Sequence, residues 1–340
     1  MTLQQLWYTR SAWVWPLLPL SLLYCGAVVL RRQAYHLGLV PSFEAGVPVL
    51  VVGNITVGGT GKTPVVIALA NWLQEQGWRP AIVSRGYGGR STRQARRVLP
   101  DSDPREVGDE PLLLARHAGC PVAVCRRRID AVALLLRETD CDVILTDDGL
   151  QHYALHRDLE LCVVSGARRF GNGWCLPAGP LREPASRLRQ VDYVLCVGAA
   201  QEGEWPVQRI LGELRGVDDA QRRASLSLLR GQRVHAVAGI GDPQQFFASL
   251  REAGLDIVEH PFPDHHVYLA HDLAFNDGQP IVMTEKDAVK CQNLCSTNAW
   301  CLQSHAQLDP GWLQQLAARL ASLRLRPWTR TPRRRWRGVW

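Results

Sequence analysis

Residues 53–64, GNITVGGTGKTP, combine closely spaced glycines with a lysine and three threonines. An apolar run precedes them and a helix-forming run follows, which is the setting of a phosphate-binding loop. The glycines let backbone N–H groups close around phosphate oxygens, and the helix N-terminus adds positive potential. Lys62 would reach the β- and γ-phosphates, and the Thr63 hydroxyl would ligate Mg²⁺. We predict nucleotide contacts by Thr56, Val57, Gly58, Gly59, Thr60, Gly61, Lys62 and Thr63.

This loop departs from the strict pattern GxxxxGK[ST], which requires glycine where the chain has Thr56. It fits the shorter form GGxGK[ST], read from Gly58 to Thr63. Dimerising ATPases with that form carry a lysine before the two glycines, and here that position is Val57. A membrane-associated P-loop ATPase that acts as a dimeric switch is therefore an alternative function, and the missing lysine counts against it.

A pair of carboxylates, Asp147 and Asp148, ends the apolar run 143–145. Ligands of an open α/β sheet lie at the carboxyl ends of its strands, so these acids are expected beside the Mg²⁺ held by Thr63. Asp-Gly pairs also favour turns, and a plain turn is the competing interpretation. With the phosphate loop upstream, we predict Thr63, Asp147 and Asp148 as metal ligands, with Gln151 lining the same pocket.

The elements that must position these residues alternate between strands and helices, which predicts a parallel sheet with helices on both faces. A chain of 340 residues, 46% of them hydrophobic, can form two domains. The fold class we predict is α/β, with a P-loop NTPase-like parallel sheet domain, a smaller α/β domain and an N-terminal membrane helix. The predicted segments are an anchor helix at 1–36, a P-loop core at 37–200, a linker at 201–232, a smaller α/β domain at 233–322 and a basic Arg/Trp tail at 323–340.

The N-terminal segment 11–30 carries no charge, and its length is about that of a membrane-spanning helix. Trp13 and Trp15 near one end are typical of a membrane interface. A buried soluble helix and a cleaved signal peptide are weaker alternatives. The excess of arginine after the run, at Arg31 and Arg32, predicts that the following domains lie in the cytoplasm. Whether the helix crosses the bilayer or lies in one leaflet stays open.

The net charge of +7 is concentrated at the C-terminus, where seven arginines follow residue 323 without any acid. The rest of the chain is formally neutral. Tryptophans at 328, 336 and 340 interleave with the arginines, which favours contact with an anionic membrane surface over a disordered tail or a nucleic-acid site. We predict membrane lipid as a partner, no nucleic acid and no obligate protein partner.

Four further patches accompany the phosphate loop: SRGYG at 84–88, VGDEP at 107–111, DDGLQH at 147–152 and TEKDA at 284–288. Together they resemble the lipid A 4′-kinases, the tetraacyldisaccharide 4′-kinases, from the anchor to about residue 320. The resemblance implies transfer of the γ-phosphate of ATP, with Mg²⁺, to the 4′-hydroxyl of a tetraacyl glucosamine disaccharide 1-phosphate. The product would be lipid IVA, in lipid A synthesis at the cytoplasmic side of the bacterial inner membrane. The arginine-rich tail lies outside the family pattern.

The resemblance also implies the catalytic residues. Asp109 in the GDEP patch would be the base that acts on the sugar hydroxyl, with His265 as its partner and Lys62 on the phosphates. Phosphoryl transfer needs an acceptor for the hydroxyl proton, and a carboxylate paired with a histidine suits that task. The competing interpretations are a helix N-cap for Asp109 and an ordinary loop histidine. His266 is adjacent and stays an alternative partner.

Substrate contacts are predicted from residue chemistry, since arginine suits bidentate phosphate binding. Solvated surface charge is the competing interpretation for each of them. The TEKDA patch can equally be a helix start, and no catalytic role is assigned to it. The candidate substrate residues are Arg85, Tyr87, Gln151, Arg182 and Glu183, with residues 126–128 as further candidates for the 1-phosphate.

Overall fold

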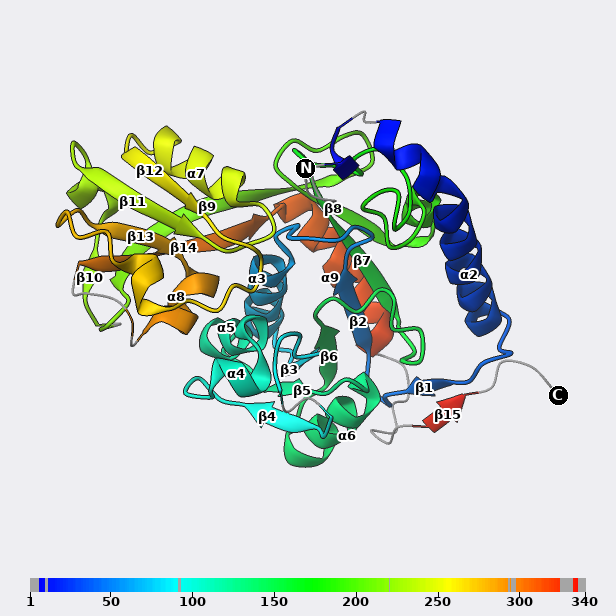
Figure 1. Ribbon diagram of the computed structural model, residues 1–340. Coiled ribbons are helices and arrows are strands. Elements are labelled where there is room, and N and C mark those ends of the chain that lie inside the picture. Colours follow the sequence, from blue (N-terminus) through cyan, green and yellow to red (C-terminus); the bar gives the residue numbers. More distant parts are fainter. Residues whose placement is uncertain are drawn as a thin grey trace.

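The computed structural model describes residues 6–9, 12–90, 93–219, 221–292, 294, 298–324 and 333–335. One large twisted sheet runs through both halves of the molecule, and a long N-terminal helix lies against one side (Figure 1). The order of its strands is β12-β11-β13-β14-β9-β8-β7-β2-β6-β3-β5-β4, with β10 paired to β9. This arrangement confirms the predicted α/β class.

The first half of the sheet is parallel except for β4, which pairs antiparallel with β5 at the edge. Its strands are short and buried, as expected where helices cover both faces. They are β2 (Val49–Gly53), β3 (Pro80–Ser84), β4 (Arg96–Val98), β5 (Val122–Val124), β6 (Val143–Thr146), β7 (Leu159–Ser165) and β8 (Tyr193–Val197). The helical segments of this half are α3 (Lys62–Glu75), α4 (Pro104–Val107), α5 (Asp109–His117), α6 (Arg128–Glu138) and η2 (Ala185–Gln190).

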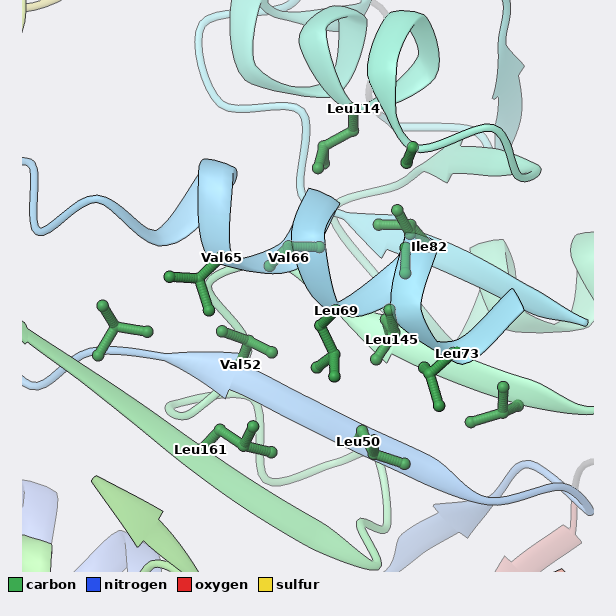
Figure 2. Close-up of a cluster of buried hydrophobic side chains, with 14 of the residues drawn as sticks. Leu50, Val52, Val65, Val66, Leu69, Leu73, Ile82, Leu114, Leu145 and Leu161 are labelled. Carbon is green, nitrogen blue, oxygen red and sulfur yellow. The ribbon is translucent and has the colours of Figure 1, made fainter. Parts of the chain in front are cut away.

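Alternate side chains of each strand enter different cores. Leu50 and Val52 of β2 face a cluster formed with α3, α5 and α9, whereas Val49 and Val51 face α6 on the other side. Figure 2 shows α3 lying over β2, β3, β6 and β7, with Leu69 among the strand side chains. This packing fixes the start of α3, and therefore the phosphate loop, above the ends of the strands.

The second half of the sheet contains the predicted smaller α/β unit. Its elements are η3 (Leu226–Leu229), β11 (Arg233–Ala238), α7 (Pro243–Glu252), β12 (Asp256–Pro261), η4 (Ala270–Leu273), β13 (Ile281–Thr284), α8 (Glu285–Cys291) and β14 (Ala299–Leu308). Strands β11, β12, β13 and β14 are parallel to their neighbours within this group.

The structure differs from the sequence prediction at the linker. Residues 201–232 contain the 12-residue strand β9 (Trp205–Gly216) and the short strand β10 (Arg223–Ala224). Strand β9 pairs in parallel with β8 and antiparallel with β14, so it joins the two halves into one sheet. Its polar residues hid the strand because buried and exposed positions are mixed along it, so the sequence lacks the continuous apolar run of the other strands.

The predicted boundary at residue 322 also differs. Helix α9 (Pro310–Arg324) follows β14 back to the first half and packs there. Its buried residues Trp312, Leu316, Leu320 and Leu323 are spaced for one helix face. The C-terminal helix therefore belongs to the core of the P-loop half.

The N-terminal segment forms η1 (Ala12–Leu17) and α2 (Leu18–His36). One face of α2 contacts the P-loop half along its length: the Ser21 hydroxyl donates to the Cys175 carbonyl at 2.6 Å, and the Tyr24 hydroxyl donates to the Arg182 carbonyl at 3.2 Å. Near its C-terminal end, the ring of Tyr35 lies 5.9 Å from that of Tyr153. The opposite face is exposed and apolar.

The predicted arginine-rich tail lies mostly outside the described residues, including its three tryptophans. Of the tail, β15 (Arg333–Arg335) pairs antiparallel with β1 (Ser42–Glu44), shortly after the end of α2 (Figure 1).

Candidate active site

The phosphate loop joins the end of β2 to the first turn of α3. Gly58 and Gly61 have φ angles of +98° and +80°, in the region that favours glycine, so the motif glycines meet a backbone requirement. The buried Asn54 amide donates to the Thr60 hydroxyl at 3.2 Å and lies 3.4 Å from that of Thr56. Asn54 therefore stabilises the loop conformation through contacts with two of its threonines, a role that the sequence motif alone did not indicate.

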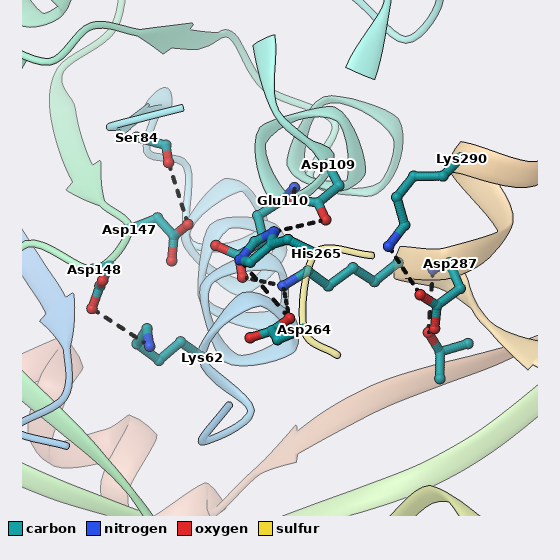
Figure 3. A network of polar contacts seen from close by, with 12 residues as sticks. Lys62, Ser84, Asp109, Glu110, Asp147, Asp148, Asp264, His265, Asp287 and Lys290 are labelled. Atoms are coloured by element: carbon teal, nitrogen blue, oxygen red, sulfur yellow. Dashed lines mark hydrogen bonds and ion pairs between the residues drawn. The ribbon is translucent and has the colours of Figure 1, made fainter. Parts of the chain in front are cut away.

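Lys62 and Asp148 face each other across the loop, with Nζ 3.4 Å from Oδ1 (Figure 3). Arg182 donates to both oxygens of the same carboxylate, at 3.0 and 2.8 Å. Burial alone would raise the pKa of Asp148, but Lys62 and Arg182 hold it well below its ordinary value. Asp148 is thus an ionised group that orients two cations at the phosphate loop.

Asp147 has a different environment. It is 1% exposed, the Ser84 hydroxyl lies 3.4 Å from one carboxylate oxygen, and the other oxygen, Oδ1, is buried without a hydrogen-bond partner among the described residues. Burial raises the pKa of Asp147 to about 7, aided by the nearby Glu110 and opposed by Lys62. An orphaned buried oxygen and a raised pKa are what a missing cation would correct.

The residues present therefore fit the predicted magnesium ion. Mg²⁺ usually takes one or two carboxylates and completes its shell with water and phosphate oxygens. Of the three predicted ligands, Asp147 and the Thr63 hydroxyl could supply the protein ligands, whereas the Asp148 carboxylate contacts Lys62 and Arg182. No cluster of three or more His, Cys, Asp or Glu side chains suited to a metal is found in the part of the chain that the structure describes, so a fully protein-built cage is not indicated there.

We expect Asp147→Asn to raise the Mg²⁺ concentration needed for half-maximal activity. Changes in the outer shell of a metal site typically cost about 10–100-fold in metal affinity, so loss of a ligand should cost at least as much. The matched control is Asp142→Asn at the start of the same strand, where the carboxylate accepts from the Arg79 backbone N–H at 2.7 Å. A magnesium titration of both variants checks this. If the Asp147→Asn and Asp142→Asn variants needed the same magnesium concentration, Asp147 would not be a metal ligand.

Asp109 and His265 come from opposite halves of the molecule and contact each other beside the phosphate-loop cavity, which His265 lines. His265 Nδ1 lies 3.2 Å from Asp109 Oδ2, and the Glu110 backbone N–H donates to the other carboxylate oxygen at 2.9 Å. The ring of Tyr87 lies 4.9 Å from that of His265. His266 instead pairs with Asp272 at 3.0 Å. The structure therefore brings His265, and not its neighbour, to Asp109.

Each member of this pair shifts the pKa of the other. The hydrogen bond to Asp109 raises the pKa of His265 against the opposing effects of burial and of Lys286. Burial alone would raise the pKa of Asp109, but His265 and Lys286 lower it. The lowered pKa of Asp109 keeps the carboxylate ionised at neutral pH, so the pair offers an acceptor for one proton.

The sequence pattern indicated no role for Lys286, and the structure places it beside this pair. Its ammonium contacts Glu110 at 2.9 Å and Asp264 at 3.1 Å, so it bridges the two halves. Burial alone would lower the pKa of Lys286, but its acidic neighbours raise it. The rest of that patch is the predicted helix start, since the Thr284 hydroxyl accepts from the Asp287 backbone N–H at the N-cap of α8.

Two cavities in this region share part of their lining. One, of about 420 Å³, extends from the phosphate loop between the halves to His265. The other, of about 350 Å³, runs from Asp147 to helix α2, where Tyr24, Val28 and Arg31 form a wall. The residues that line both are Tyr87, Glu110, Asp148 and Arg182.

The predicted substrate residues divide into lining and supporting groups. Arg85, Tyr87, Gln151 and Arg182 line the cavity beside α2. Glu183 is fully buried and does not line it. Its carboxylate instead accepts from Gln151 at 2.7 Å and from the Tyr153 hydroxyl at 2.6 Å, so it fixes two cavity residues from behind.

Of the three arginines at 126–128, Arg128 is 5% exposed and donates to the backbone carbonyls of Asp147 and Asp148, at 3.2 and 2.7 Å. It therefore supports the acidic turn rather than standing free for a phosphate.

A phosphate loop with a lysine, an acidic pair at the end of a parallel strand and a carboxylate–histidine pair whose imidazole lines the phosphate-loop cavity define a P-loop phosphotransferase. The model of the LpxK family, described as tetraacyldisaccharide-1-P 4′-kinase, matches residues 13–321. The chain belongs to this family, as its motifs predicted.

Relatives named tetraacyldisaccharide 4′-kinase cover nearly the whole chain. The protein of Alkalilimnicola ehrlichii is 53% identical over 307 residues, which are 90% of this chain and 92% of the relative. That of Nitrosococcus oceani is 50% identical over 314 residues, or 92% and 93%. Among solved structures, LpxK from Aquifex aeolicus, crystallised in complex with ATP, matches with a TM-score of 0.76 and 29% identity, over 91% of this chain and 99% of that one.

Proposed function

We propose that the protein transfers the γ-phosphate of ATP to the 4′-hydroxyl of a tetraacyl glucosamine disaccharide 1-phosphate, giving lipid IVA. The observation that carries this is the meeting of the two cavities. The phosphate-loop cavity suits the nucleotide, and the second cavity leads from the acidic pair to the exposed helix α2. A lipid-linked sugar could enter from the membrane side with its hydroxyl toward the transferring phosphoryl group.

In this mechanism the protein positions groups and neutralises charge. Lys62 binds the phosphates, and Asp148 and Arg182 keep its ammonium in place. Mg²⁺, held by Asp147 and Thr63, would neutralise charge on the phosphate oxygens. The Asp109–His265 pair accepts the hydroxyl proton as the sugar oxygen attacks. The Tyr87 ring packs at a tilt against His265 and steadies the imidazole.

A thin-layer assay with γ-labelled ATP and the lipid disaccharide tests this function. We expect the label to move to the lipid, with little inorganic phosphate formed when lipid is absent. Label that appears only as inorganic phosphate, whether or not lipid is present, would favour the rival ATPase switch.

We also propose that α2 lies along the membrane surface instead of crossing the bilayer. The helix is long and apolar enough to cross. However, Ser21, Tyr24 and Tyr35 contact the P-loop half, and these positions span roughly 20 Å of the helix axis. A helix with a globular domain along one face has only its other face available for lipid. That face carries exposed Leu20, Leu22, Leu23 and Leu30, and Trp13 and Trp15 are exposed in the preceding η1.

We expect a triple replacement of Leu22, Leu23 and Leu30 by glutamine to move protein from the membrane fraction to the soluble fraction. Each of these side chains is at least 61% exposed, so the fold should persist while apolar contact with lipid is lost. The control replaces Leu99 and Leu228, exposed leucines away from α2.

Vesicle sedimentation measures the change. The same triple replacement must also be made in a chain that ends at Arg324, because the arginine-rich tail could itself hold the protein on anionic lipid. Undiminished sedimentation of that shortened variant would contradict the proposal. A complementary deletion of residues 1–32 should weaken use of micellar lipid more than ATP binding.

A further inference from the structure

Arg209 of β9 is directed at the phosphate loop from the strand that joins the two halves. Its Nη2 lies 3.7 Å from the position that a Cβ on Gly61 would occupy. The side chain also lines the cavity that contains the whole loop from Val57 to Thr63. Among the described residues it has no hydrogen bond or ion pair, and its electrostatic neighbour is Asp242.

A second arginine near the loop, Arg168, differs from Arg209 because its guanidinium already has partners. Arg168 lies 3.4 Å from the Cβ position of Gly58 and donates to the Gly241 carbonyl at 2.5 Å. It also stacks over the ring of Tyr8, with its Cζ 4.3 Å from the ring centroid. The donors of Arg168 are therefore used in holding the two halves together, whereas those of Arg209 remain available.

The surroundings of Arg209 favour an anionic ligand. Burial lowers the pKa of its guanidinium, and Asp242 only partly offsets this effect. Asp242 is shared, since it lies 4.0 Å from Arg168 and its carboxylate also accepts from the Gln245 backbone N–H at the start of α7. A poorly paired, partly buried cation gains most from a multiply charged partner, and arginine suits phosphate geometry.

We propose that Arg209 binds the phosphates of the nucleotide held by the phosphate loop, as a second cation beside Lys62. This role rests on the proposed kinase function and deepens it. It would also supply the charge that the loop lacks at Val57, where the related dimerising ATPases have a lysine. Because Arg209 pairs with Ala306 in the register of β9 and β14, its position depends on how the two halves are joined.

Nucleotide binding to the full-length protein in detergent tests the proposal. We expect Arg209→Gln to raise the Kd for ATP about 10- to 100-fold, the usual effect of losing a hydrogen bond to a charged group. The salt dependence of ATP binding should also become shallower. Arg209→Lys should keep part of the affinity. The control is Arg215→Gln, which removes the other arginine of β9 at a position that does not line the cavity.

Isothermal titration with ATP, together with thermal unfolding of the unliganded variants, separates binding from folding. A Kd for Arg209→Gln within twofold of the wild type, or an equal loss in Arg215→Gln, would overturn the proposal. Failure of the kinase function would have a different signature: the wild-type protein would bind ATP but transfer no phosphate to the lipid, and the comparison of ATP affinities would still decide the role of Arg209.

Discussion

Replacing Lys62 with alanine is expected to reduce phosphate transfer by several powers of ten while the fold persists. The ammonium lies against Asp148 at the start of α3, where a phosphate bound by the loop would meet it. Charge on the transferring group is stabilised mainly by such preorganised cations, and removing one from a phosphoryl-transfer site typically costs about 10³–10⁵-fold. Asp148 retains Arg182 in the variant, so the acidic turn should keep its place.

Initial rates with saturating ATP and lipid check this expectation. The matched control is Lys290→Ala, which also removes a lysine paired with an aspartate, at 3.0 Å from Asp287, but at a position that lines neither cavity. Circular dichroism of both variants reports on folding. If a folded Lys62→Ala protein kept more than about a tenth of the wild-type rate, the assignment of the phosphate loop would be wrong.

The Asp109–His265 pair gives the second large effect. Removing a positioned acid–base group typically costs about 10²–10⁴-fold, so Asp109→Ala and His265→Ala should each lower kcat strongly. The KM for ATP should change little, since neither residue is asked to hold the nucleotide. His266→Ala is the matched control, because that imidazole contacts Asp272 and stacks on Phe262 rather than facing Asp109.

The double variant distinguishes one shared task from two separate ones. If the pair acts as a unit, Asp109→Ala combined with His265→Ala should be much less impaired than the product of the single effects. Strictly multiplicative losses, with His266→Ala the more damaging histidine change, would remove the pair from the mechanism.

The pH profile gives an independent check on the pair. A raised pKa means that His265 takes up its proton at a higher pH than a free histidine, whose ordinary value is 6.5. The rate should therefore fall as the pH drops through a value above 6.5, because the proton acceptor is then occupied. In His265→Ala the remaining acidic limb should move to lower pH, toward that of the carboxylate Asp109.

Local sequence patterns predicted much of the fold and the site. The alternation of strands and helices along the chain predicted a parallel sheet covered by helices, and the P-loop half has that arrangement. The phosphate loop and the acidic pair could be predicted because backbone geometry and charge restrict their residue types to a short stretch. Contact between Asp109 and His265, 156 residues apart in the chain, was predicted only through the family resemblance.

Other features depend on long-range packing that no local pattern encodes. Strand β9 is stabilised by pairing with β14 and β8, one on each side. This pairing does not require an apolar sequence, so the polar composition of β9 resembled that of a linker. Lys286 gains its place only when Glu110 and Asp264 of the two halves meet. Glu183 is polar and next to Arg182, yet it is buried behind the cavity because Gln151 and Tyr153 satisfy its oxygens.

The most direct test of the central claim is to locate the phosphate in the product. The purified wild-type protein is incubated with ATP, Mg²⁺ and the lipid disaccharide 1-phosphate, and the lipid is then analysed by phosphorus–proton correlation NMR. We expect a new phosphate monoester coupled to the proton on carbon 4′ of the sugar, and its absence with Lys62→Ala. A lipid that is unchanged while ATP is consumed, or one phosphorylated at another position, would contradict it.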